Sequence, residues 1–374
     1  MGAFYARRAR RLLPAAVLVL VVTLVASSIW LSPLQAPVVA ADALAAALYV
    51  ANYRFAAQRT DYLADSSPSP LQHYWSLGVE EQFYLLWPLL LLGVFLAARR
   101  RSRSARPRAA AVVLALAGGG LFALSLHQTT VSQPWAFFSL PTRARELAAG
   151  GLVALTANGL RRLPGLVAAT VGWLGLEAVV WSVADLGPST PFPGTAALFP
   201  VGGTVAVLAA GYAAPRFGPD LLLRRRHLQV GGRLSYAWYL WHWPLLVLAP
   251  AVAGHPLGLA ARLGLVGAGG LLALATVKLV EDPVRFSPRL RARPGRSLAV
   301  GAGLTGRRWP PPWPRLPSSP CPTARVSPPR RPPCGSPGRL SPGRRRAGTR
   351  RQPGWPPCPR RSNGQWPRRR GRAR

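Results

Sequence analysis

Cysteine, lysine and acidic residues are scarce in this 374-residue sequence. The three cysteines, Cys321, Cys334 and Cys358, all lie in the last quarter of the chain, which indicates no disulfide framework or metal site in the rest. One lysine stands against 46 arginines, and Asp and Glu together number 11. The formal net charge is therefore +36, which in a soluble protein would suggest nucleic-acid binding.

Apolar residues, in contrast, are abundant and make up 49% of the chain. Before residue 300 they form long runs, and a helix needs about 20 mostly apolar residues to cross a bilayer. The arginines concentrate in short connections between these runs, such as RRRSRSARPR (99–108) and LLLRRRHL (221–228). Because this distribution orients membrane helices, the pattern predicts a protein embedded in a lipid bilayer and disfavours nucleic acid as a partner.

The apolar runs predict an all-α integral membrane protein, a polytopic bundle of about eight spans. If the arginine clusters all face the cytoplasm, the helices alternate in direction without conflict, and both ends of the membrane domain lie inside. No small-residue cleavage site follows the first run, so we expect a spanning helix there and not a signal peptide. The predicted spans are 12–31, 77–98, 109–126, 135–157, 166–186, 195–214, 234–253 and 263–280.

The moderately apolar stretch VVAADALAAALYVANYRFAA (38–57) does not fit this scheme. Counted as a span, it would place the arginine-rich loop 99–108 on the outer side. We therefore predict a re-entrant or surface helix that packs over a cavity, since backbone at membrane depth that does not span needs protein cover.

The composition changes abruptly near residue 305, beyond which Arg, Pro and Gly dominate. Such a segment cannot bury a core, so 297–374 is predicted to be a disordered basic tail. Two origins remain open: a genuine cytoplasmic tail, or a frameshifted sequence, because SLAVGAGLTG (297–306) begins like a membrane helix and stops. The chain then divides into an arginine-rich cytoplasmic segment (1–11), a membrane domain (12–296) and this tail.

Two adjacent carboxylates, Glu80 and Glu81, lie at the entrance of the second span. On a helix, positions three or four residues apart share a face, so Glu80 belongs to a polar stripe and Glu81 points about 100° away. The stripe is either a site facing the bundle interior or a set of interfacial anchors with both glutamates in solvent. Its members are His73, Ser76, Glu80, Tyr84 and Trp87.

The segment FYARRARRLLP (4–14) places four arginines directly before the first span. They are either a topology signal or a site for the phosphate groups of a cytoplasmic donor, since arginine forks suit that geometry. Arg143 and Glu146 form an i, i+3 pair near a span boundary, where simple mutual neutralisation is the alternative to a site. His242 lies within an aromatic belt, and Pro283, between Glu281 and Arg285, favours a helix end.

Taken together, five ordered motifs resemble the membrane acyltransferase-3 family, the OafA-type O-acyltransferases. The resemblance implies a ten-helix domain that passes an acyl group, commonly acetyl, from a cytoplasmic acyl-CoA to a hydroxyl of a carbohydrate-like acceptor. It also implies the plasma (inner) membrane of a bacterium, a polysaccharide, lipid-linked glycan or metabolite as acceptor, and no metal. The motifs are FYARRARRLLP (4–14), SPLQHYWSLGVEEQFYLLWP (69–88), PTRARELAAG (141–150), GRLSYAWYLWHWP (232–244) and VEDPVR (280–285).

The resemblance also implies roles for single residues. The candidate catalytic residues match a Ser-Leu-x-x-Glu-x-x-x-Tyr signature, with Glu80 expected to bind or to polarise reacting groups. The candidate substrate-binding residues come from the arginine motif and from the other matching segments. The catalytic set is Ser76, Glu80 and Tyr84, and the substrate-binding set is Arg7, Arg8, Arg11, His73, Arg143, Glu146 and His242.

One departure from the family pattern concerns the start of the sequence. Family members have two helices ahead of the arginine motif, the first carrying a histidine expected to act as catalytic base, whereas here Met1 is three residues before Phe4. We therefore expect an amino-truncated copy with little or no transferase activity by itself, since general-base catalysis contributes roughly 10²- to 10⁴-fold. A transporter or flippase and a non-catalytic remnant remain the alternatives.

Overall fold

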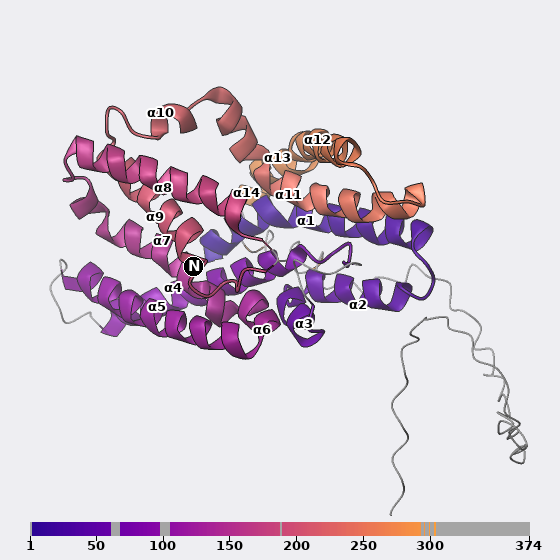
Figure 1. Cartoon of the computed structure of the whole chain (residues 1–374), viewed down its shortest axis with the longest axis horizontal. Coiled ribbons are helices and arrows are strands. Elements are labelled where there is room, and N and C mark those ends of the chain that lie inside the picture. Colours follow the sequence, from indigo (N-terminus) through magenta and orange to yellow (C-terminus); the bar gives the residue numbers. More distant parts are fainter. Residues whose placement is uncertain are drawn as a thin grey trace, which may run out of the picture. The chain divides into compact units, whose positions relative to one another are not determined.

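The computed structural model describes residues 2–60, 68–97, 105–187 and 189–292, and beyond them only residues 295, 299 and 303 (Figure 1). Every regular element within these ranges is a helix, so the predicted all-α class is confirmed. Almost all of the predicted tail, 297–374, lies outside the described residues, as does most of the arginine-rich loop 99–108.

Five helices are long and apolar enough to cross a membrane. Each coincides with a predicted span, because continuous runs of apolar helix-forming residues satisfy their backbone hydrogen bonds internally. The fifth continues through a π-helical turn, Val277–Glu281, into the short α13, Asp282–Phe286. The five are α1 (Gly2–Trp30), α4 (Tyr74–Ala97), α5 (Ala105–Val131), α8 (Gly165–Asp185) and α12 (Leu259–Thr276) with its continuation.

The other three predicted spans are also helical but differ in length or polarity. Helix α9 (Leu198–Ala213) has only 16 residues, and α11 (Arg226–Ala253) interrupts its aliphatic run with Trp, Tyr, His and Pro side chains. The predicted span 135–157 is divided into α6 (Gln133–Phe138) and α7 (Leu140–Leu160). Ser139 takes an extended conformation between them, and a proline in the first turn of α7 suits a new helix start.

The stretch 38–57 forms two short helices, α2 (Ala36–Ala47) and α3 (Ala51–Ala57), neither long enough to span. Tyr49 lies between them with a left-handed φ of 56°. Helix α4 approaches this break at Gly78, where an added Cβ would lie 3.1 Å from the Tyr49 carbonyl oxygen and 3.0 Å from Asn52 Oδ1. The absence of a side chain at Gly78 therefore permits the close approach.

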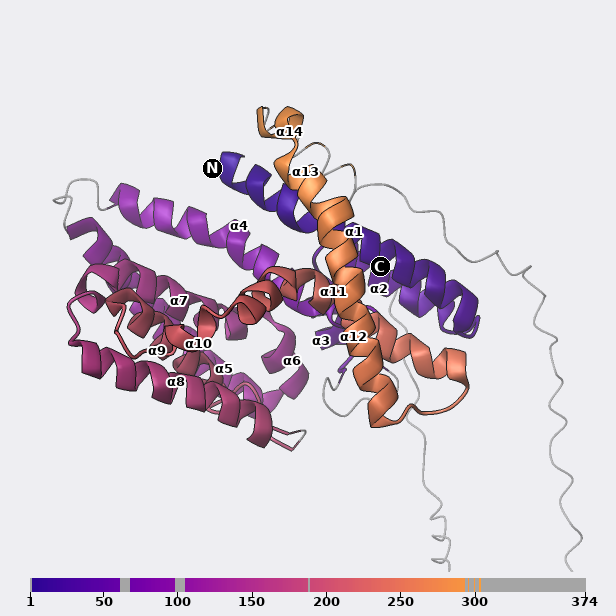
Figure 2. The same ribbon diagram turned by 90° about the horizontal axis from the view of Figure 1, so that it is seen from above.

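The helices pack in pairs: α5 with α7, α8 with α9, α11 with α12, and α1 with α2 and α11. Figure 2 shows α5, α7, α8 and α9 together, and α1, α2, α11 and α12 as a second group. The main buried cluster joins residues of this second group to residues of α3, α4 and α6, and it includes Val19, Phe55, Leu71 and Leu240. Large apolar side chains are exposed along the spanning helices, as expected for helices that face lipid.

Candidate active site

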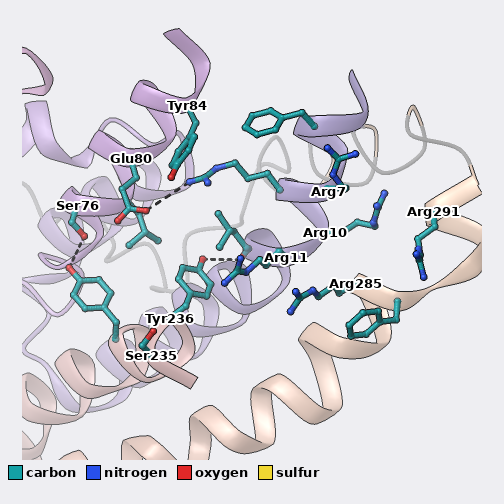
Figure 3. Close-up of a pocket in the computed structure, with 16 residues that line it drawn as sticks. Arg7, Arg10, Arg11, Ser76, Glu80, Tyr84, Ser235, Tyr236, Arg285 and Arg291 are labelled. Carbon is teal, nitrogen blue, oxygen red and sulfur yellow. Dashed lines mark hydrogen bonds and ion pairs between the residues drawn. The ribbon is translucent and has the colours of Figure 1, made fainter. Parts of the chain in front are cut away.

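A cavity of about 820 Å³ opens at the N-terminal end of α1 (Figure 3). Its walls come from α1, α4, α11, α13 and α14 (Pro288–Ala292), which lie far apart in the sequence. Most of its polar side chains are arginine, tyrosine or serine. They are Arg7, Arg8, Arg10, Arg11, Ser76, Glu80, Tyr84, Ser235, Tyr236, Tyr239, Arg285 and Arg291.

The α4 side of the cavity contains Ser76, Glu80 and Tyr84, the three candidate catalytic residues. Their spacing puts them on one face, and residues of α1 and α11 form the facing walls of the cavity. Trp87, one turn further on, instead stacks on Phe83 with ring centroids 4.8 Å apart. The polar stripe therefore faces the interior only as far as Tyr84.

Arg8 of α1 is the main link to α4. Its Nε lies 3.0 Å from both carboxylate oxygens of Glu81, its Nη2 lies 3.9 Å from Glu80 Oε2, and its guanidinium lies 3.4 Å from the Tyr84 ring centroid. Glu81 is therefore a structural partner of Arg8, because α1 crosses α4 where Arg8 reaches both glutamates. Glu80, whose side chain is 53% exposed, is left accessible to a ligand.

The remaining arginines differ in how they are held. Arg10 Nη1 donates a hydrogen bond of 3.1 Å to the Leu290 carbonyl, and Arg285 Nη1 lies 3.6 Å from Glu281 Oε1. The side chains of Arg7 and Arg11 are exposed and form no ion pair with any acid in the described ranges. The lining residues thus include six guanidinium groups and one carboxylate, that of Glu80, which suits a ligand bearing several phosphates.

The hydroxyl of Ser76, on the α4 side of the cavity, is held by Tyr239 of α11. Tyr239 Oη lies 2.7 Å from Ser76 Oγ and 2.7 Å from the His73 carbonyl oxygen. Ser76 Oγ also lies 3.3 Å from the His73 carbonyl oxygen, so both hydroxyls can donate to this carbonyl, and either hydroxyl can donate to the other. Ser76 Oγ keeps its remaining lone-pair capacity for a hydrogen bond from a ligand.

His73 and His242 lie behind this pair and are not in the cavity wall. Their ring centroids are 6.2 Å apart, and His242 Nδ1 lies 2.6 Å from the Tyr239 carbonyl, which places the proton on that nitrogen. His73 occupies the turn before α4, where burial lowers the pKa of its imidazole well below the usual value, with a further contribution from His242. His73 is therefore neutral and part of the floor that supports Ser76.

Arg143 and Glu146 lie at the corner between α6 and α7. Arg143 Nη1 is 3.0 Å from Glu146 Oε1, its Nε donates to the Phe137 carbonyl at 2.9 Å, and its guanidinium lies 4.8 Å from the Phe192 ring centroid. Neither residue is among those that line the arginine-rich cavity. This geometry agrees with the alternative that Arg143 and Glu146 neutralise each other's charge at a helix corner.

Several residues of the cavity were not among the sequence candidates: Arg10, Tyr236, Tyr239, Arg285 and Arg291. Only Arg291 lies outside the matching motifs, so the positions of the other four residues carried a usable signal. The interpretation of Pro283 as a helix end is wrong, because the chain continues helically from the π turn into α13 with a proline in its first turn. This continuation brings Arg285 to the cavity.

A bundle with several membrane-length apolar helices and an arginine-lined cavity at one end defines a multi-pass membrane protein suited to a polyanionic ligand. The chain belongs to the family of the acyltransferase domain, whose model matches residues 1–277. The acyltransferase-3 resemblance inferred from the motifs is thereby confirmed.

Known relatives have names that agree with this family. The chain is 31% identical to the putative peptidoglycan O-acetyltransferase YrhL of Bacillus subtilis, over 75% of this chain and 45% of the relative. It is 28% identical to the peptidoglycan O-acetyltransferase OatA of Listeria monocytogenes, over 75% of this chain and 46% of the relative. It is 25% identical to the O-acetyltransferase OatA of Staphylococcus aureus strain MRSA252, over 79% of this chain and 51% of the relative. The chain thus spans about half the length of these curated relatives. No solved structure matches it.

Proposed function

We propose that this protein is a membrane O-acyltransferase that takes an acyl group, commonly acetyl, from acyl-CoA and transfers it to a hydroxyl of a cell-surface carbohydrate. Family membership and the names of the relatives support the reaction class. The observation that carries the proposal is the meeting of Arg7, Arg8 and Arg11 with Ser76, Glu80 and Tyr84 around one cavity of about 820 Å³. That volume is within the usual range for small-molecule sites, about 300–1,000 Å³.

The donor would bind through its phosphate groups to the arginines of α1, α13 and α14. Arg7 and Arg11 are exposed and carry full positive charge, so they can form charge-assisted hydrogen bonds without first breaking an ion pair. Since arginine-rich ends of membrane helices lie in the cytoplasm, the cavity would open there, where acyl-CoA is available.

The acyl end of the donor would then lie near the α4 side of the cavity. In the transfer, the thioester C–S bond and the acceptor O–H bond break, an ester C–O bond forms, and the proton ends on the coenzyme thiol. Glu80 is the carboxylate that the wall offers, and we assign it to binding and polarising a reacting group. Ser76 Oγ would accept a hydrogen bond from the bound donor.

Donor binding by the purified full chain tests this proposal most directly. We expect Arg7→Gln combined with Arg11→Gln to weaken acetyl-CoA binding at least about tenfold, because two charge-assisted hydrogen bonds are lost. Arg161→Gln combined with Arg162→Gln removes two positive charges outside the cavity wall and should leave binding unchanged.

Transfer itself is measured as labelled acetyl passing from acetyl-CoA to envelope glycan in membranes that contain the full chain. Glu80→Gln should lower this transfer without preventing donor binding. Equal donor affinity in the wild type and in the Arg7/Arg11 double variant would overturn the assignment of the cavity to acyl-CoA.

A further inference from the structure

A second cavity, of about 640 Å³, lies at the other end of α1. Trp30, Leu31 and the following loop contribute to its wall, together with α2, α3, the turn before α4 and the second half of α11. Leu12 lines the first cavity and Trp30 the second, and the 18 helical rises from one residue to the other span about 27 Å. Because this length is close to the hydrocarbon thickness of a bilayer, about 30 Å, the two cavities lie toward opposite membrane faces.

The second cavity differs from the first in charge. Asp42 is the charged side chain among the described residues of its wall, and Arg54 Nε forms an ion pair with its Oδ1. The negative charge of Asp42 is therefore compensated inside the structure. A cavity whose described wall carries no uncompensated charge offers little to a polyanion such as the donor and suits a neutral ligand.

Two polar side chains in this wall have atoms without hydrogen-bond partners in the described part of the chain. They are Oδ2 of Asp42, whose residue is 1% exposed, and both amide atoms of Gln72, which is 0% exposed. Burying polar groups without partners costs free energy, so such groups are usually matched by another group. Here the unmatched set is two acceptor oxygens and one N–H donor group.

We infer that this second cavity binds a neutral polyhydroxylated ligand, such as a sugar ring, with Gln72 and Asp42 as its recognition residues. A hydroxyl both donates and accepts, so neighbouring hydroxyls on a ring satisfy the oxygens and the N–H group together. A lipid acyl chain would leave all of them unmatched. The aliphatic side chains and the rings of Trp30 and Phe55 complete the mostly apolar lining that ligand cavities have.

The position of Gln72 relates this ligand to the transfer reaction. Gln72 directly precedes His73, whose carbonyl binds the Tyr239 hydroxyl, and Ser76 follows in the first cavity. The turn 68–73 therefore connects the two cavities along the chain. If the proposed function holds, on which this step rests, the polyhydroxylated ligand is the acyl acceptor.

The test is binding of the neutral disaccharide N,N′-diacetylchitobiose to the full chain in lipid nanodiscs, measured by saturation-transfer difference NMR, with acetyl-CoA binding measured on the same samples. We expect Gln72→Leu to weaken disaccharide binding by about tenfold, since hydrogen bonds to the amide are lost, and to leave acetyl-CoA affinity unchanged. Gln229→Leu makes the same chemical change at an exposed position outside both cavities and should change neither.

A second variant keeps the test decisive if Gln72→Leu does not fold. Ala251 lines the cavity but is exposed, so Ala251→Trp fills the space without disturbing the buried cluster, and it should also abolish disaccharide binding. Acetyl-CoA binding without any disaccharide binding, or equal disaccharide affinity in Ala251→Trp, overturns the inference and leaves the donor site standing. If the wild type binds the disaccharide, Ala251→Trp loses that binding and neither protein binds acetyl-CoA, the result supports the neutral site and contradicts the proposed function.

Discussion

At the scale of single residues, the hydrogen-bond directions around Ser76 limit what this serine can do. Its proton goes either to the Tyr239 hydroxyl or to the His73 carbonyl. A serine nucleophile needs a base that accepts its proton, and neither a tyrosine hydroxyl nor a backbone carbonyl is one. Ser76 is therefore a positioning residue or a ligand acceptor, and Tyr239 fixes its orientation.

Tyr239→Phe tests that orientation. We expect the free energy of unfolding to fall by about 0.5–1.5 kcal/mol, because the His73 carbonyl loses the shortest of its hydrogen bonds and keeps only the longer ones from Ser76. Acetyl-CoA binding should also weaken, since Ser76 is released to rotate. Thermal unfolding and donor titration of the purified chain measure the two effects. Tyr212→Phe, at a half-exposed tyrosine of α9, is the control, and an unchanged donor affinity in Tyr239→Phe would contradict the positioning role.

Substituting the two adjacent glutamates should have different effects on stability and on activity. Glu81→Gln removes the charge that holds Arg8 at two distances of 3.0 Å, so we expect a loss of stability of about 1–3 kcal/mol. Glu80→Gln touches Arg8 only at 3.9 Å and should leave stability almost unchanged while lowering acetyl transfer. Chemical or thermal unfolding of both variants measures the two stability losses. A larger loss for Glu80→Gln than for Glu81→Gln would refute the distinction.

At the scale of elements, the packing of α4 against the break between α2 and α3 depends on Gly78. The space there is limited by backbone and by a polar atom of Asn52, which is itself buried and hydrogen-bonded. Such neighbours cannot move as a flexible side-chain end would. The contact therefore fixes the position of the helix that carries Ser76, Glu80 and Tyr84.

Gly78→Ala should destabilise the protein by about 1–3 kcal/mol, because the new methyl group must push neighbours away. Gly93→Ala, in the same helix with no atom near the added Cβ, should be neutral or stabilising by up to about 1 kcal/mol. The comparison is made by thermal unfolding in detergent. Equal melting temperatures for the two variants would show that α4 does not depend on this approach.

The sequence predicted those parts of the site that depend on local periodicity. Helical spacing placed Ser76, Glu80 and Tyr84 on one face, and the apolar runs located the helices. The partnership of Arg8 with Glu81 was not predictable, because it depends on how α1 crosses α4, which no local pattern encodes. Likewise, nothing in the periodicity of 135–157 indicates that the chain extends at Ser139 and divides the helix.

At the scale of the whole described bundle, the two cavities at the ends of α1 differ in charge: one is positive and the other is neutral. One is lined by six arginines, and the other contains one carboxylate compensated by Arg54. Exposed charges attract a polyanion less when salt screens them, whereas hydrogen bonds between neutral groups are almost unaffected. The two cavities should therefore respond differently to ionic strength.

We expect acetyl-CoA affinity to fall severalfold between 0.01 and 0.15 M salt, where the screening length drops from about 30 to 8 Å, while disaccharide affinity stays constant. Titrating both ligands into the same preparation of the full chain at each salt concentration measures the difference. A parallel loss of both affinities would mean that the neutral cavity is governed by charge after all.

The π-helical turn Val277–Glu281 determines where the last arginines of the donor cavity point. A π turn accommodates one residue more than an α-helical turn, and each residue of an α-helix rotates the chain by about 100°. Removing one residue from this turn would restore a regular α-helix and hardly alter the hydropathy of the segment. Because the π turn already absorbs the extra residue, this deletion would leave Arg285 facing the cavity. Deleting a residue from the regular part of α12 would instead rotate Arg285 by about 100° away from it. The π turn thus lets the chain hold one additional residue without changing the direction of the arginines that follow.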